Sequence, residues 1–369
     1  MRVFVAGATG VVGRRLVPLL IAQGHSVTAI ARSSNKRVEL TRAGAKPVAA
    51  DLFSSAALHG AVRGHDAVVN MATHIPSPAW RVVLRSAWAE NDRIRREGSA
   101  NLVDAAIAVG AARFIQESFA PVYPDGGDKW IDESTPLAPT AYNRTVLDAE
   151  RSAQRFTDSG RAGVVLRFGA FYGPDAEHLA DTTRMVRKGR APMPGDPGAY
   201  ISSCSHDDAA SAVVAALLAE PGVYNIVDDQ PLTHREYFDS MAEALGVPPP
   251  RLLPRWATLL LGGIGKLLAR SHASPIFASA PRPPGSRAIR ACAKDGPRRL
   301  PAWSVAPPRR RPGSSGAYAL TLPRIARKPS VSRMLARSVS VSSRRRSAKP
   351  AVTAWPRTSS AFSVCPISA

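Results

Sequence analysis

A glycine turn near the N-terminus limits the possible folds of this chain more than any other sequence feature. Three glycines, each three residues after the last, follow the apolar run Arg2–Ala6 and precede leucines at helical spacing. Such a turn needs glycines for a tight bend, for close approach of a phosphate to the backbone, and for contact between strand and helix. The start of the helix would offer free N–H groups to a diphosphate. The expected cofactor contacts in this turn are Gly7, Thr9, Gly10, Val11, Val12 and Gly13.

Apolar runs alternate with long helical stretches over residues 1–173. The expected strands are Arg2–Ala6, Ser26–Ala31, Pro47–Ala50, Ala67–Ala72, Arg113–Glu117 and Gly163–Arg167. The longest expected helices cover about 87–109 and 146–159. Strands separated by such helices pair in parallel. We therefore predict an α/β fold in which residues 1–173 form a doubly wound, dinucleotide-binding Rossmann domain.

We predict that residues 174–270 form a smaller α/β substrate-binding region, which is interleaved with the Rossmann sheet. Its expected elements are helices at Asp207–Ala219, His234–Leu245 and Trp256–Ala269 and a strand at Val223–Val227. Gly246 is expected to end the second of these helices.

The basic character of the chain belongs to residues 271–369. This segment holds 19 of the 49 Lys and Arg residues, one of the 28 acidic residues and 18 serines. Apolar residues recur there at neither strand nor helix spacing, so we predict a disordered Arg/Pro/Ser-rich tail. It has no recognisable nucleic-acid fold and predicts no specific nucleic-acid partner. The abrupt change in composition suggests an out-of-frame terminus, which translation of the other two reading frames beyond codon 270 would test.

Cysteine usage and the apolar runs indicate the compartment. Cys204, Cys292 and Cys365 lie far apart without metal-ligand spacing, which favours a reducing compartment and no metal site. No signal peptide is evident, because the first strand runs directly into the glycine turn. The longest apolar run, Trp256–Leu268, contains Lys266 and is too short for a membrane span. We expect a cytoplasmic protein without a membrane span.

The end of the second expected strand indicates which nicotinamide cofactor binds. NAD enzymes usually place an acid there for the ribose hydroxyl, whereas an arginine accommodates the phosphate of NADP. Here Ala31 takes the acidic position and Arg32 follows it. We favour NADP over NAD, with a solvent-facing Arg32 as the alternative.

Several further motifs resemble the extended and atypical short-chain dehydrogenases/reductases, and in particular the NAD-dependent epimerase/dehydratases. The motifs are Asp51-Leu52, Asn70-Met-Ala72, Gly98–Ala106, Val122-Tyr123, Ala141-Tyr142, Leu166–Pro174, Ser205–Asp208 and Tyr224–Val227. The resemblance covers about residues 1–270. It implies that Asp51 and Leu52 lie at the adenine and Ala72 near the nicotinamide ribose.

The resemblance also implies a catalytic triad of Ser, Tyr and Lys, in which the lysine lowers the pKa of the tyrosine. Tyr142 takes the tyrosine position, but Val146 stands where the lysine is expected. The serine position aligns with Phe119, and Ser118 lies one residue earlier. We predict Tyr142 and Ser118 as the catalytic residues of an altered triad. Glu150 is expected to be a charge on a helix surface.

Two main functions remain open at this point, and a nucleic-acid-associated protein that acts through the basic tail is a third, weaker alternative. One is an NAD(P)-dependent oxidoreductase or epimerase that acts on a small hydroxyl- or carbonyl-bearing substrate, possibly a nucleotide sugar. The other is a non-catalytic NAD(P)-binding protein that senses redox state, in which Tyr142 would only hydrogen-bond the ribose. A homodimer is possible in either case.

Overall fold

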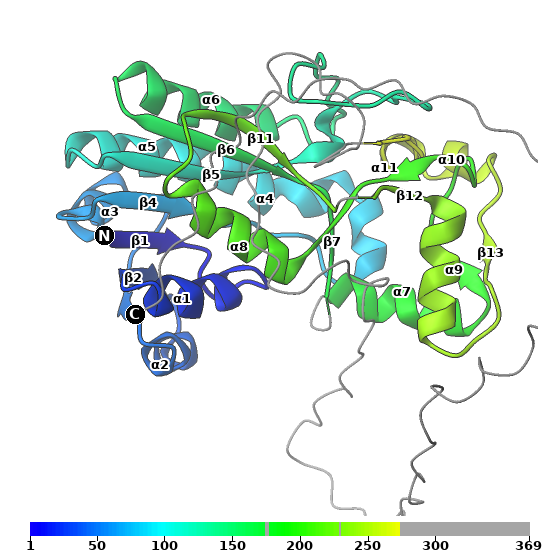
Figure 1. The fold of residues 1–369 in the computed structure, drawn as a ribbon, viewed down its shortest axis with the longest axis horizontal. Helices are drawn as coiled ribbons and strands as arrows, with labels where there is room; N and C mark the ends of the chain where they lie inside the picture. The colour runs from blue at the N-terminus through cyan, green and yellow to red at the C-terminus, as the bar shows by residue number, and fades with distance from the viewer. Residues whose placement is uncertain (174–176, 229, 274–369) are drawn as a thin grey trace, which may run out of the picture. The chain divides into compact units, whose positions relative to one another are not determined.

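A parallel sheet forms the centre of the computed structural model, which describes residues 1–173, 177–228 and 230–273. In these residues the sheet has seven strands in the order β11-β6-β5-β4-β1-β2-β3 (Figure 1). The strands are β1 (Arg2–Ala6), β2 (Ser26–Ile30), β3 (Lys46–Val48), β4 (Ala67–Asn70), β5 (Arg113–Phe119), β6 (Ala162–Phe168) and β11 (Gly222–Ile226). All neighbouring strands in this sheet run parallel. The predicted doubly wound sheet is confirmed.

The strand order reverses direction at β1, which lies between β2 and β4. Val3 of β1 pairs with Val27 on one side and Ala67 on the other. The connection that follows β1 covers one face of the sheet, and the connection that follows β4 covers the other face. The two connections therefore diverge and leave a crevice at the carboxyl ends of these strands. Ligands of open α/β sheets bind in such crevices.

Helices cover both faces of the sheet. The first face carries α1 (Gly13–Ala22) and α8 (His206–Ala216), and the second carries α3 (Ser55–Val62), α5 (Ser99–Ala108) and α6 (Val146–Asp158) (Figure 1). Alternate residues of β1 divide between the two layers: Val3 and Val5 pack under α1 and α8, and Phe4 packs under α3 and α5. Such alternation follows from the two-residue period of a strand.

Two predicted long helices are interrupted. In place of one helix over 87–109, the chain forms α4 (Ala89–Arg93), a π-helical turn at Ile94–Gly98, and α5. The predicted helix Trp256–Ala269 is divided into α10 (Ala257–Leu260) and α11 (Gly262–Leu268), because Gly262 adopts a φ of +59°. Apolar spacing predicted the extent of both helical stretches but not these interruptions.

A smaller lobe forms around α7 (Glu177–Arg187) and α9 (His234–Ala244). Three short strand pairs complete it: β7 (Ala170–Tyr172) with β10 (Ser203–Ser205), β9 (Tyr200–Ile201) with β12 (Leu232–Thr233), and β8 (Arg190–Ala191) with β13 (Arg251–Leu252). The segment that builds this lobe also supplies α8 and β11 to the large sheet.

The chain remains packed beyond the boundary predicted at residue 270. The Ser271 hydroxyl donates to the carbonyl of Gly127 at 2.6 Å and accepts from the Tyr200 amide at 3.0 Å. The His272 carbonyl accepts from the Ser202 hydroxyl at 2.7 Å. Residues 271–273 are thus packed against the folded part of the chain, whereas the sequence analysis assigns them to the tail. The remaining tail residues, 274–369, lie outside the described residues, and their disorder and reading frame stay predictions.

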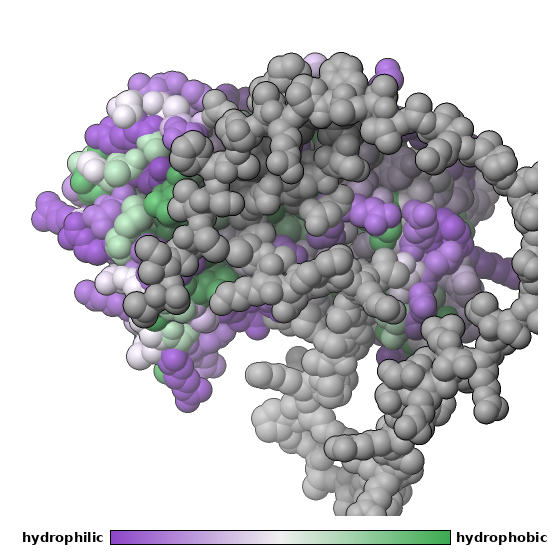
Figure 2. Space-filling view, in the orientation of Figure 1, coloured by the Kyte–Doolittle hydropathy of each residue, from purple (hydrophilic) through white to green (hydrophobic). Residues whose placement is uncertain are grey.

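The outer surface of α2 (Ser34–Arg42) is polar. Leu40 is buried, and the other residues of this helix are exposed. Hydrophilic side chains cover the corresponding lower left of Figure 2. Among the described residues, no helix combines the length and the apolar character that crossing a membrane requires.

Candidate cofactor and active site

The glycine turn between β1 and α1 can be built only from residues without a side chain at two positions. Gly7 has a φ of +81°, and a Cβ there would lie 2.3 Å from the carbonyl oxygen of Met71. A Cβ on Gly13 would lie 2.3 Å from the Gly7 carbonyl oxygen. The Gly10 amide donates to that same carbonyl at 3.0 Å. Both positions therefore require glycine, and binding of a diphosphate at this turn stays a prediction.

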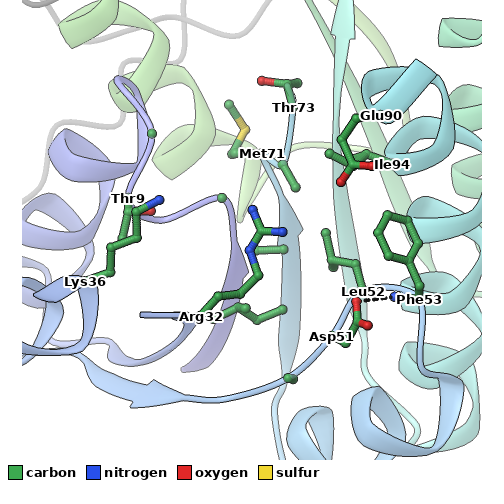
Figure 3. A pocket seen from close by; sticks show the side chains of 16 residues that line it. Thr9, Arg32, Lys36, Asp51, Leu52, Phe53, Met71, Thr73, Glu90 and Ile94 are labelled. Atoms are coloured by element: carbon green, nitrogen blue, oxygen red, sulfur yellow. Dashed lines mark hydrogen bonds between the residues drawn. The ribbon is translucent and has the colours of Figure 1, made fainter. Parts of the chain in front are cut away.

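A cavity of about 180 Å³ lies beside this turn, at the carboxyl ends of β1, β2 and β4 (Figure 3). Seven residues predicted to contact the cofactor line it: Gly7, Thr9, Gly10, Arg32, Asp51, Leu52 and Ala72. The predicted contacts Val11, Val12 and Gly13 are not part of its lining. Val12 is instead buried in the core beneath α1. The size and position of the cavity suit the adenosine half of a dinucleotide.

Two basic side chains occupy one side of the cavity. Arg32 follows β2, and Lys36 lies in the first turn of α2; both line the cavity beside Thr9 (Figure 3). Ser33 caps α2 by accepting a hydrogen bond from the Lys36 amide at 3.4 Å, so the cap positions Lys36. Sequence reasoning missed Lys36, although a serine three residues before a lysine at a helix start could have indicated it.

The opposite side of the cavity is mainly apolar. Asp51 accepts a hydrogen bond from the Phe53 amide at 3.0 Å, which fixes the turn after β3. The Phe53 ring is in turn covered by the Arg93 guanidinium, 3.7 Å from the ring centroid. Ile94 from the π-helical turn completes this side, together with Ile30, Ala50 and Leu52. Neither Phe53 nor Ile94 was expected here.

The Asn70-Met-Ala72 motif fixes the end of β4. The Asn70 amide donates to Ser99 at 3.1 Å and to Gln116 at 3.0 Å, and its oxygen accepts from the Ala72 amide at 3.2 Å. All three polar side chains are buried. This network holds Ala72 against the cavity.

Tyr142 lies in a turn before α6 and is not among the residues that line the cavity. Its hydroxyl donates to the Val83 carbonyl at 2.8 Å, and its ring packs edge-on against Trp88 with centroids 6.3 Å apart. Val146, at the position of the expected lysine, is fully buried at the start of α6. The tyrosine hydroxyl is therefore already hydrogen-bonded to the segment that follows β4.

Ser118 is held in a different, buried network. Its hydroxyl donates to the Glu150 carboxylate at 2.5 Å, and Arg167 donates to the same carboxylate at 2.8 and 2.7 Å. Arg167 also donates to the Tyr123 hydroxyl at 2.7 Å. The structure thus gives Ser118 and Tyr142 separate partners. The expectation that Glu150 is a surface charge is wrong, because its side chain is only 11% exposed and pairs with Arg167.

Burial and pairing together set the pKa values of this network. Burial lowers the pKa of Arg167, but hydrogen bonds to Glu150 and the charge of that carboxylate outweigh this effect and raise it overall. Burial likewise raises the pKa of Tyr123. Both groups therefore keep their protons at neutral pH, and neither supplies a base.

Among the described residues, no group of three or more His, Cys, Asp or Glu side chains is arranged to hold a metal ion.

Comparison with known proteins identifies the family. The model of the NAD dependent epimerase/dehydratase family matches residues 3–226. The chain belongs to this family. The protein has an NAD(P)-dependent, oxidoreductase- or epimerase-like function.

Relatives in the family include enzymes named as reductases. A 3-diazoavenalumate denitrifying reductase from Streptomyces sp. is 38% identical over 271 residues, which cover 69% of this chain and 84% of the relative. A 2-alkyl-3-oxoalkanoate reductase from Shewanella oneidensis is 27% identical over 292 residues, covering 73% and 72% respectively.

Solved structures show the same fold. UDP-glucose 4-epimerase from Thermus thermophilus, in complex with NAD, aligns with a TM-score of 0.58 and 24% identity over 75% of this chain and 90% of that one.

Proposed function

We propose that the protein is an NADPH-dependent reductase whose hydride transfer does not depend on a tyrosine–lysine pair. The observation that carries this proposal is the contrast between the two halves of the site. The cleft for the dinucleotide has its glycines and two cations, whereas Val146 replaces the lysine and the Tyr142 hydroxyl donates to Val83. These contacts support an altered triad, in which the missing lysine is the group that would lower the pKa of the tyrosine.

The preference for NADP over NAD is supported by two cations on one side of the cleft. Arg32 and Lys36 would hold a ribose phosphate, and Ala31 leaves no carboxylate at the end of β2 to repel it. Replacing either cation with alanine should weaken NADPH binding about tenfold and change NADH binding little. Equal losses for both cofactors would contradict the preference.

The chemistry of the acceptor separates reduction from epimerisation. Epimerisation begins with oxidation of an alcohol, which needs a base to remove the hydroxyl proton. Bound NADPH would supply a hydride. An aryl diazonium cation that accepts this hydride on carbon releases N2 and becomes a neutral arene, so it needs no proton from the protein. The relative named 3-diazoavenalumate denitrifying reductase makes an aryl diazonium compound the first acceptor to test, with a 3-oxoalkanoate as the second.

The decisive experiment compares wild type with Tyr142→Phe on these two acceptors and on a nucleotide sugar, following NADPH oxidation and product. We expect turnover of the diazo acceptor with less than about a tenfold loss in the variant, because no proton transfer is required. Turnover of the 3-oxo acid, which does require a proton, should fall about a hundredfold or more if Tyr142 serves as the acid. Conversion of the nucleotide sugar alone would refute the proposal.

A second candidate, a non-catalytic sensor of redox state, is supported by the same contacts of Tyr142. It would be favoured by saturable NADPH binding without turnover of any acceptor. A cytoplasmic location is also proposed, supported by the free, buried Cys204. A homodimer stays a prediction, and sedimentation of the purified chain would test it.

A further inference from the structure

Two carboxylates lie on the apolar side of the dinucleotide cleft. Glu90 and Asp51 both line the cavity there, opposite Arg32 and Lys36 (Figure 3). The apolar side chains of Leu52, Phe53 and Ile94 line the cavity on the same side, and a purine ring could pack against them. Charge is thus divided across the cleft, with cations where a phosphate would bind and carboxylates where the base would bind.

Helix geometry directs Glu90 into the cleft. Glu90 lies one helical turn before Ile94, so the two side chains share a face of the helix. Ile94 is buried against the core and also lines the cavity. The Glu90 side chain is therefore held above the apolar surface on which a base would lie.

The two carboxylates differ in what they already bind. One oxygen of Asp51 accepts a hydrogen bond from the Phe53 amide at 3.0 Å, so this carboxylate already has a partner within its own turn. The Glu90 carboxylate has no hydrogen bond or ion pair with any residue that the structure describes, and only the main-chain carbonyl of Glu90 accepts a bond, from the Ile94 amide. Both carboxylates lie near Arg93: its hydrogen bond to Glu97 raises its pKa most, and the charges of Glu90 and Asp51 raise it further.

A carboxylate without a partner in a cleft that binds an anionic cofactor costs binding energy unless the cofactor offers it a donor. The adenine of a dinucleotide carries one such group, its exocyclic amine, which donates two hydrogen bonds. A purine with a 6-oxo group offers an acceptor at the same place and would be repelled.

We propose that Glu90 accepts a hydrogen bond from the exocyclic amine of adenine and makes the cleft select adenine over a 6-oxo purine. The inference rests on the same dinucleotide cleft as the proposed function, but it does not depend on the reaction or on the choice between NADP and NAD.

The test measures dissociation constants of the full chain for NADPH and for its deaminated analogue, nicotinamide hypoxanthine dinucleotide phosphate in reduced form, by cofactor fluorescence. Wild type should prefer NADPH by about 10- to 100-fold, as expected for a hydrogen bond to a charged group. Glu90→Gln should reduce this preference to about threefold or less and should bind the analogue more tightly than wild type does, because its amide can donate to the 6-oxo group.

Two matched variants distinguish Glu90 from its neighbours. Asp51→Asn should retain most of the preference for adenine, and Glu97→Gln, which changes an exposed carboxylate outside the cleft, should retain all of it. Glu90→Asp keeps the charge on a shorter side chain and should keep an intermediate preference. Circular dichroism would establish that each variant is folded.

Three results would overturn the proposal: equal binding of the two purines by wild type, full preference in Glu90→Gln, or loss of preference in Asp51→Asn alone. A chain that discriminates the purines but oxidises no NADPH would refute the proposed reductase and leave this inference standing. A chain that reduces an acceptor but does not discriminate the purines would refute the proposed role of Glu90 and leave the proposed reductase standing.

Discussion

Replacing Glu150 with glutamine should cost the protein far more stability than a helix-surface carboxylate would. Glu150 accepts three hydrogen bonds, one from Ser118 and two from Arg167. The Arg167 side chain is only 5% exposed, so water cannot solvate the guanidinium once the negative charge of Glu150 is removed. Glutamine keeps the shape of the side chain, but it places an amide donor against donors that need an acceptor.

The expected loss is about 3 kcal/mol in the free energy of unfolding. Removing one partner of a buried ion pair typically costs about 3–5 kcal/mol, since the other charge stays buried without compensation. The lower value applies here because the glutamine oxygen still accepts one hydrogen bond. With a urea dependence of about 3 kcal/mol per molar for a domain of this size, the midpoint of unfolding should fall by about 1 M.

Urea unfolding followed by circular dichroism measures this shift, with Asp104→Asn as the matched control. Asp104 pairs with Arg155 across α5 and α6, and the two side chains are 53% and 50% exposed. That variant should lose less than about 1 kcal/mol. Combining Glu150→Leu with Arg167→Met should restore much of the stability that Glu150→Gln loses, because no buried charge remains.

Equal midpoints for Glu150→Gln and Asp104→Asn would refute this reasoning. The same holds if the double variant is less stable than Glu150→Gln, since the network would then contribute through its packing and not through the pairing of its charges.

Three further predictions concern other parts of the fold. Gly13→Ala should weaken NADPH binding at least about tenfold, because its Cβ would lie 2.3 Å from the Gly7 carbonyl oxygen, whereas Gly60→Ala, with open space around it, should leave binding unchanged; equal affinities would contradict the packing. Ser271→Ala should lower the free energy of unfolding by about 1–3 kcal/mol through loss of its bonds to Gly127 and Tyr200, and an unchanged urea midpoint would count against a folded role for this residue. Burial lowers the pKa of His272 from 6.5 to about 4, so its contribution to stability is complete above about pH 6.5 and is lost as the pH falls towards 4, by about 3 kcal/mol in all; His272→Gln should flatten this part of the pH–stability curve.

Local sequence patterns were sufficient to predict those features that depend on residues close together in the chain. The glycine turn, the strands and their parallel order follow from spacing within short windows, and the structure has them where they were predicted. The cavity likewise contains most of the expected contacts of the dinucleotide, including Arg32 and Asp51. Arg32 and Asp51 lie within three residues of the end of a strand, and parallel strands bring such positions to one edge.

Other features depended on segments that are distant in the sequence. Ser118, Glu150 and Arg167 come from β5, α6 and β6, and nothing in the α6 sequence shows that Glu150 faces an arginine of the following strand. A charge at helical spacing is usually solvated, and only the packing of α6 on the sheet buries this one.

The sequence by itself determined that the chain forms a doubly wound sheet with a glycine turn for a dinucleotide, because backbone sterics and the alternation of strands and helices act over a few residues. Only the tertiary structure decided what each polar side chain binds. Tyr142 meets the Val83 carbonyl and Ser118 meets Glu150, while Glu90 enters the cleft without a partner among the described residues. Hydrogen bonds and ion pairs depend on distances of about 3 Å between groups that the chain brings together only when it folds.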